Sequence, residues 1–158
     1  MRRIAGYALV FAFVSAHVPA GVMAQTARGP VFTHTGETSE HRTGLYAWKA
    51  LLGRIPGAHS PELDDGGWPD VRLPHRWEGS GTDCWFRRTV VIPKEMAGRS
   101  IVLKIAMDGE GELFVNGRSE ALFCNRCEHE ITSAARGGAR YHIAVHGKSH
   151  TVSGMLMD

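Results

Sequence analysis

The chain has 158 residues, of which 18 are Lys or Arg, 16 are Asp or Glu, and 43% are apolar. This length allows one domain of ordinary size and excludes most large catalytic scaffolds, such as a complete eight-fold α/β barrel. The 22% share of charged residues is typical of a globular protein. The 19 glycines favour many turns and therefore a β-rich fold.

The first segment has the pattern of a secretory signal peptide. Two arginines follow Met1, an apolar run extends from Ile4 to Ala16, and small residues precede a predicted cleavage after Ala24. An uncleaved membrane anchor is the alternative, and Pro19 disfavours it because proline interrupts a spanning helix. We therefore expect residues 1–24 to be a cleaved signal peptide and the protein to be secreted or periplasmic.

Cleavage would also change the charge balance. The two arginines that are lost account for the formal net charge of +2, so the mature chain is expected to be neutral. A neutral chain lacks the basic surface that nucleic acids and anionic membranes attract. We expect neither partner for the mature protein.

Residues 25–59 are expected to form an exposed leader with one short element. Between Gly44 and Ile55, apolar residues recur at helical spacing, which predicts a short amphipathic helix ended by Pro56. A strand around 45–48, at the edge of a following sheet, is an equal alternative.

Residues 60–158 are expected to form an antiparallel β-sandwich. Apolar residues alternate from Ile101 to Met107 with the period of a half-buried strand. Asn116-Gly117 follows a short apolar run and is typical of a tight hairpin turn. The count of seven or eight short strands indicates an all-β jelly roll. The other predicted strands are residues 71–73, 85–92, 118–123, 128–131, 141–146 and 151–157.

Three segments carry a family resemblance: DDGGWPDVRLPHRW (64–77), CWFRRTVVIP (84–93) and GELFVNG (111–117). In this order they resemble the galactose-binding-like jelly-roll domain of family-two glycoside hydrolases. The stretch 108–131 is also similar to accessory sandwiches of bacterial α-mannosidases. In those enzymes the catalytic groups lie in a separate, larger domain. The resemblance thus implies a non-catalytic carbohydrate-binding or accessory domain of a secreted glycoside hydrolase, from a truncated or fragmentary chain without its catalytic domain.

The resemblance also implies partners and residue roles. The expected partner is a carbohydrate or a glycosidase catalytic domain. Trp68, Trp77 and Trp85 would mainly pack in the core or at sheet ends. Arg87 or Arg88 would form a buried or edge ion pair. A stand-alone secreted carbohydrate-binding protein is the alternative function.

Sugar binding by a jelly roll commonly uses an aromatic ring against the apolar face of the sugar. Trp77 is the best candidate because it lies in a polar, glycine-rich segment where a ring could stay exposed. His75 and Glu78 flank it and could contact hydroxyl groups. Trp85 and Asn116 complete the set of candidate carbohydrate-binding residues.

The cysteines support several hypotheses. Cys124 and Cys127, with His129 close by, could contribute to a zinc site or a redox motif. In an exported protein, a disulfide between two of Cys84, Cys124 and Cys127, or unpaired thiols, is the simpler expectation. A metal or redox protein is therefore a further alternative function.

Acidic residues cluster at 62–70 and 108–112, beside glycines in turn-like stretches. A glycosidase needs two carboxyl groups at a defined separation. Neither cluster identifies such a pair, so no catalytic residue is assigned. The loop 108–112 could hold Ca²⁺, but we expect no cofactor, with Ca²⁺ and Zn²⁺ as the alternatives.

Overall fold

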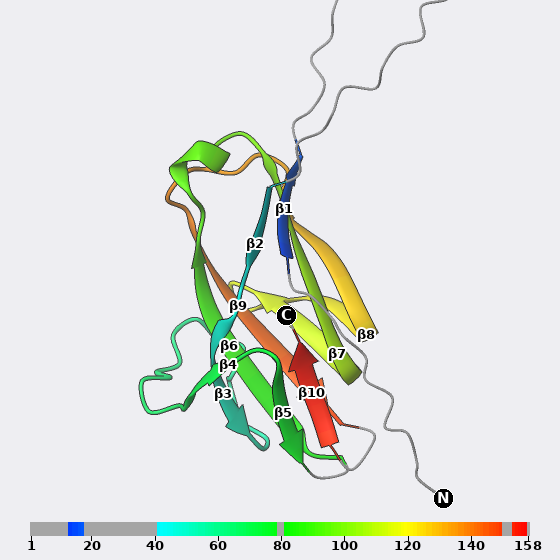
Figure 1. Cartoon of the computed structure of the whole chain (residues 1–158). Coiled ribbons are helices and arrows are strands. Elements are labelled where there is room, and N and C mark those ends of the chain that lie inside the picture. The colour runs from blue at the N-terminus through cyan, green and yellow to red at the C-terminus, as the bar shows by residue number, and fades with distance from the viewer. Residues whose placement is uncertain (1–12, 18–40, 79–80, 150–152, 158) are drawn as a thin grey trace, which may run out of the picture.

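A computed structural model of the chain describes residues 13–17, 41–78, 81–149 and 153–157. Within these ranges the structure is all-β, with one short 3-10 turn, η1 (Lys94–Met96), and no α-helix (Figure 1). The strands are β1 (Phe13–His17), β2 (His41–Gly44), β3 (Ala47–Leu52), β4 (Asp70–Arg72), β5 (His75–Glu78), β6 (Asp83–Val91), β7 (Ser100–Val115), β8 (Arg118–Thr132), β9 (Arg140–Lys148) and β10 (Ser153–Met157).

All of these strands pair in antiparallel fashion within one sheet. The main path runs in the order β2-β1-β7-β9-β6-β3-β4, while β8 pairs with β7 and β10 pairs with both β5 and β7. The prediction of an antiparallel, all-β fold from residue 60 onward is therefore confirmed.

The long strand β7 connects two parts of this sheet. Its residues 100–103 pair with β1, whereas its residues 110–115 pair with β9. Between these parts, the register with β8 shifts after Ala106. Gly109 has a φ of +121°, and a Cβ there would lie 2.5 Å from the carbonyl oxygen of Lys148. Glycine is therefore required where β7 changes partners.

Two local predictions for β7 are confirmed. Ile101, Leu103 and Met107 are buried, as the alternation predicted. Asn116 and Gly117 have φ values of +49° and +81° and connect β7 to β8 as a hairpin. Both residue types tolerate this left-handed backbone, which explains the sharp reversal.

The helix considered for residues 44–55 is wrong, because the segment forms strand β3. This strand hydrogen-bonds to β6 on one side and β4 on the other, so it is not an edge strand. Trp48 and Ala50, two residues apart, are both buried. The sheet thus includes residues before 60 that were expected to belong to a leader.

Only part of the expected signal peptide is described. Residues 13–17 form β1, which lies between β2 and β7, rather than a helix. The expected cleavage site after Ala24 lies outside the described residues. No helix in the described part of the chain is long and apolar enough to cross a bilayer.

Neighbouring residues of β6 contribute to two apolar clusters. Phe86 packs in the main core with residues of β5, β7 and β9, whereas Trp85 packs in a second cluster. We call residues 53–69, which project between β3 and β4 (Figure 1), the covering loop, because four of its residues pack in this second cluster. The second cluster and its partly buried neighbours are Ala58, Trp68, Trp85, Phe114, Ala144, Leu51, Ile55 and Leu63.

Candidate functional site

The Trp77 ring is part of the core. The side chain is 3% exposed, its Nε1 donates a hydrogen bond to the carbonyl oxygen of Thr82 at 3.2 Å, and its ring packs 5.6 Å from that of Phe86. The prediction of an exposed ring is wrong. The reason is that β5 pairs with β10 and turns the ring toward β6, where burial removes a large apolar area from water.

The other sugar-binding candidates do not gather around Trp77. His75 also lies on β5 and contacts Phe86 edge-on at 5.9 Å, and burial lowers its pKa. Glu78 is exposed at the end of the same strand. Asn116 instead anchors the hairpin turn, where its Oδ1 accepts a hydrogen bond from the backbone N–H of His142.

The three cysteines are free thiols, so none of the expected disulfides is formed. Cys84 is buried in β6, and burial raises its pKa to about 12. On β8, Cys127 is buried while Cys124 is exposed. Burial, followed by the nearby Glu128 carboxylate, raises the pKa of Cys127. These buried thiols are poor nucleophiles and metal ligands, because the thiolate form is disfavoured.

Two of the acidic residues expected in turns form ion pairs within the chain, and residues 108–112 lie on strand β7 rather than in a loop. Asp65 pairs with Arg87 at 3.1 Å, and Asp70 pairs with Lys49 at 3.1 Å. Glu112 accepts a hydrogen bond from the Ser119 hydroxyl at 2.6 Å. Within the described ranges, no group of three or more His, Cys, Asp or Glu side chains could hold a metal ion. The Cys124, Cys127 and His129 set does not form such a group.

Arg87 attaches the covering loop to the sheet. Its side chain is 1% exposed and donates to the carbonyl oxygens of Ser60 at 3.0 Å and Leu63 at 3.1 Å, besides its pair with Asp65. The guanidinium also lies over the Trp68 ring at 5.5 Å. The predicted buried ion pair is therefore present at Arg87, and its role is structural.

His142 completes the surroundings of Arg87. Its Nε2 lies 3.2 Å from Nε and 2.9 Å from an Nη of Arg87. Burial and the Arg87 charge lower the pKa of His142, while the Asp65 carboxylate partly opposes this. The imidazole is therefore held neutral and accepts from the guanidinium.

A pocket opens where the covering loop begins, and we call it the Asp83 pocket. Its volume is about 430 Å³. The Asp83 carboxylate is only 10% exposed; its Oδ1 lies 3.0 Å from His146 Nε2, and its Oδ2 accepts from Arg54 Nε at 3.2 Å. The lining residues are Arg54, Ile55, Pro56, Asp83, Trp85, His146 and Lys148.

Trp85 forms one wall of this pocket. Its ring stacks on that of His146 at 4.5 Å with an angle of 16°, and it lies 5.6 Å from the ring of Phe114. The residue is 8% exposed, so Trp85 does not present an open face to a sugar. Its Nε1 is buried without a hydrogen-bond partner among the described residues.

Sequence reasoning included Trp85 but missed the polar residues around it. Asp83 and His146 are separated by 63 positions. They meet because β6 and β9 pair in a register that places Trp85 opposite His146 and Asp83 opposite Lys148. No local pattern in the sequence indicates this register.

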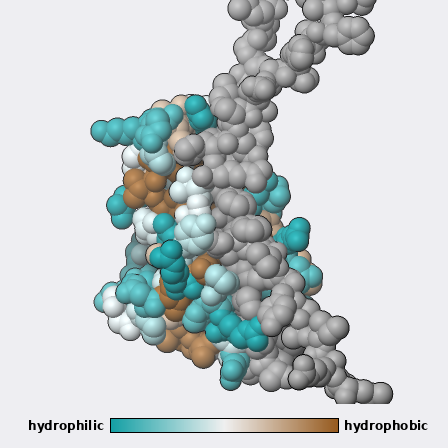
Figure 2. Space-filling view, viewed as in Figure 1, coloured by the Kyte–Doolittle hydropathy of each residue, from teal (hydrophilic) through white to brown (hydrophobic). Residues whose placement is uncertain are grey.

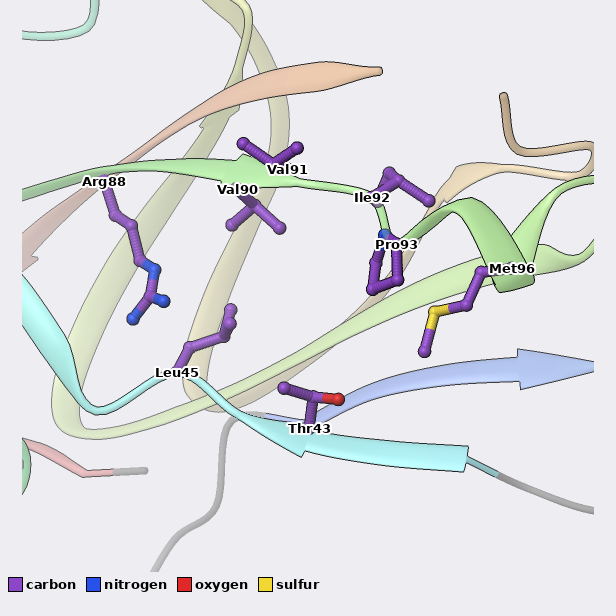
Figure 3. Close-up of a pocket in the computed structure, with 8 residues that line it drawn as sticks. All are labelled: Thr43, Leu45, Arg88, Val90, Val91, Ile92, Pro93 and Met96. Atoms are coloured by element: carbon purple, nitrogen blue, oxygen red, sulfur yellow. The ribbon is translucent and has the colours of Figure 1, made fainter. Parts of the chain in front are cut away.

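A second, apolar cleft lies between β2 and the end of β6, and Figure 3 shows its lining. Leu45, Val90 and Met96 surround a small space of about 100 Å³, with Thr43 and Pro93 at its margin. In the space-filling view, apolar side chains reach the surface in separate areas between polar ones (Figure 2). The exposed large apolar residues of the described ranges are Tyr46, Leu52, Val91 and Leu122.

Neither a protein-family model nor a curated protein sequence matches the chain. Solved structures do match it. A glycosyl hydrolase family 2 member from Bacteroides cellulosilyticus is 24% identical with a TM-score of 0.58, and the match covers 71% of this chain and 20% of that chain. Bacteroides uniformis β-glucuronidase is 20% identical with a TM-score of 0.57, and the match covers 70% of this chain and 17% of that chain. A β-glycosidase from Bacteroides vulgatus is 20% identical with a TM-score of 0.56, and the match covers 71% of this chain and 19% of that chain.

The chain shares its fold with one part of family-two glycosidases. It spans a fifth or less of the length of the three enzymes compared. The matched part is therefore far smaller than a whole enzyme of this kind. The family-two resemblance of the three sequence segments and the structural likeness agree.

Proposed function

We propose that the chain is a non-catalytic accessory domain of a secreted glycoside hydrolase, with a galactose-binding-like jelly-roll fold. The observation that carries the proposal is the fold shared with 17–20% of each of three glycosidases. Fold alone does not determine activity. The environments of three acidic residues add support for a non-catalytic role, because Asp65, Asp70 and Asp83 each form an ion pair with an Arg or Lys of this chain.

The sandwich arrangement is supported by the core. Apolar residues of β7, among them Ile101 and Leu103, share one buried cluster with Phe86 of β6 and Val145 of β9. The part of β7 that contains Ile101 and Leu103 pairs with β1, whereas β9 and β6 pair with each other. Side chains from two portions of the sheet thus enclose a common core, as they do in a β-sandwich.

The aromatic residues favour an accessory role over sugar binding through a tryptophan platform. The four tryptophans of the chain are all buried, and they are Trp48, Trp68, Trp77 and Trp85. A polar contact with carbohydrate remains available at the Asp83 pocket. A catalytic domain could instead pack against the apolar cleft beside Val91 (Figure 3), because exposed apolar side chains mark interaction surfaces.

Secretion is part of the proposal and rests on the N-terminal sequence pattern. Cleavage after Ala24 would remove β1, so β2 and residues 100–103 of β7 would lose that strand in the mature protein. Sequencing the N-terminus of the protein recovered from the periplasm or the medium tests this step. A mature protein that begins at Gln25 is expected, and an N-terminus at Met1 would contradict it.

The function itself is tested with the purified chain and a panel of chromogenic glycosides, followed by a glycan array. We expect no hydrolysis. Turnover that survives further purification would contradict the accessory role. Tight glycan binding by a chain that associates with no glycosidase would favour the stand-alone binding protein instead.

A further inference from the structure

We infer that the Asp83 pocket is a binding site for the carboxylate group of an acidic sugar. The inference rests on the proposed function for the choice of a sugar as ligand, whereas the preference for an anion rests on the charges of the pocket alone. Apart from Trp85, none of the lining residues belongs to the three segments that carry the family resemblance.

The hydrogen-bonding groups of the pocket favour a ligand that accepts hydrogen bonds. Asp83 is the one carboxylate in the lining, and both of its oxygens have partners, His146 at Oδ1 and Arg54 at Oδ2. The other charged groups of the pocket are donors: the terminal nitrogens of Arg54 and the ammonium of Lys148. A ligand rich in acceptors complements this set.

The charges of the pocket lining favour an anionic ligand. Among the lining residues, Arg54 and Lys148 carry two positive charges and Asp83 one negative charge, while Glu110 of β7 lies opposite Lys148 in the β7–β9 register. The structure places no carboxylate of a described residue in an ion pair with Lys148, and the Arg54 side chain is 90% exposed. Because Asp83 engages Arg54 through Nε, the two terminal nitrogens can take a carboxylate in the bidentate geometry that guanidinium favours.

The size and the apolar part of the lining favour a sugar over a small inorganic anion. Its volume of about 430 Å³ lies within the range of small-molecule sites and exceeds the need of a bare inorganic anion. Ile55, Pro56 and Trp85 add an apolar wall to the lining. Such a wall suits the C–H face of a pyranose ring. Together these features select a carboxylated sugar over a free anion and over a neutral sugar.

The test is calorimetric titration of the full chain with glucuronate and galacturonate, compared with glucose and galactose. We expect the hexuronates to bind about tenfold more tightly than the hexoses. Arg54→Gln and Lys148→Gln should each weaken hexuronate binding about tenfold. Lys94→Gln, at an exposed lysine of η1, is the matched control and should bind as the wild type does. A melting curve verifies that each variant is folded.

The indole N–H resonances provide a second readout, since the Trp85 signal should move on binding and the Trp77 signal should not. Equal affinity for hexuronates and hexoses, or unchanged binding in Arg54→Gln, would overturn the site and leave the proposed function standing. Acetate or sulfate binding as tightly as hexuronate would overturn the sugar as ligand. Absence of binding by every probe would overturn the inference as a whole.

Discussion

The Arg87 guanidinium lies 3.1 Å from the Asp65 carboxylate, beneath the covering loop. Arg87 belongs to β6 and Asp65 to the covering loop, so the ion pair joins two segments that are not adjacent in the sequence. Two loop carbonyls accept from the same guanidinium. This arrangement fixes the loop whose first residues form the Asp83 pocket.

Replacement of Arg87 should therefore destabilise the fold. We expect Arg87→Met to lower the free energy of unfolding by about 3 kcal/mol, because the loop carbonyls and Asp65 lose their buried partner. Asp64→Asn is the control, since Asp64 is exposed and, among the described residues, accepts a hydrogen bond from the Gly66 N–H alone. Its effect should stay within about 0.5 kcal/mol. Urea titration measures both, and equal stability of Arg87→Met and wild type would show that the anchor is unimportant.

Trp77→Ala should act on stability rather than on sugar binding. Truncation of a buried aromatic side chain leaves a cavity, and we expect a loss of about 3–5 kcal/mol in the free energy of unfolding. Trp77→Phe should lose less, because much of the contact with Phe86 remains. A Trp77→Ala protein of normal stability that no longer binds carbohydrate would restore the sequence-based hypothesis.

Stability should also depend on pH through His142. Burial and Arg87 lower its pKa in the folded chain, so the unfolded chain takes up a proton first as the pH falls below about 6.5. The stabilisation is complete above that pH and is lost progressively below it. His75, whose pKa is lowered by burial, acts in the same direction.

Urea titrations between about pH 8 and about pH 5 measure this dependence, because histidine titrates in that range. His142→Gln keeps an acceptor for Arg87 but cannot be protonated. We expect a smaller loss of stability toward acid pH in the variant than in the wild type. The same loss in both proteins would exclude His142 as the source.

Thiol reactivity should separate the three cysteines. Exposed Cys124 should react with a maleimide in the native protein, whereas Cys84 and Cys127 should react only after unfolding. Burial and the raised pKa of Cys84, about 12, both protect that thiol. Mass spectrometry counts the labels, and a protein purified without reductant that shows fewer than three reactive thiols in denaturant would reveal a disulfide.

Sequence patterns sufficed where structure is local. The alternation from Ile101 to Met107 and the Asn116-Gly117 turn depend on neighbouring residues only, and both are confirmed. Residues 44–55 were ambiguous because Leu45, Trp48 and Leu52 fit a helical face. The segment forms a strand because β3 pairs with β6, and this pairing depends on residues outside the segment.

The site was harder to predict than the fold, because its residues meet only through strand pairing. Trp77 is buried by contacts with β6 and by the pairing of β5 with β10, a strand near the C-terminal end of the sequence. Asp83 and His146 come together through the register of β6 and β9. Such long-range register is set by the whole sheet, so a polar pocket of this kind leaves no signature in the sequence.

The most direct test of the accessory role uses a family-two glycosidase from which the domain of this fold has been deleted. The purified chain is added to this truncated enzyme, and hydrolysis of a chromogenic glycoside is measured together with complex formation by sedimentation. We expect no turnover by the chain alone, and a complex in which the truncated enzyme gains activity or stability. Turnover by the chain alone, abolished by substitution of one of its own carboxylates, would contradict a non-catalytic, accessory role.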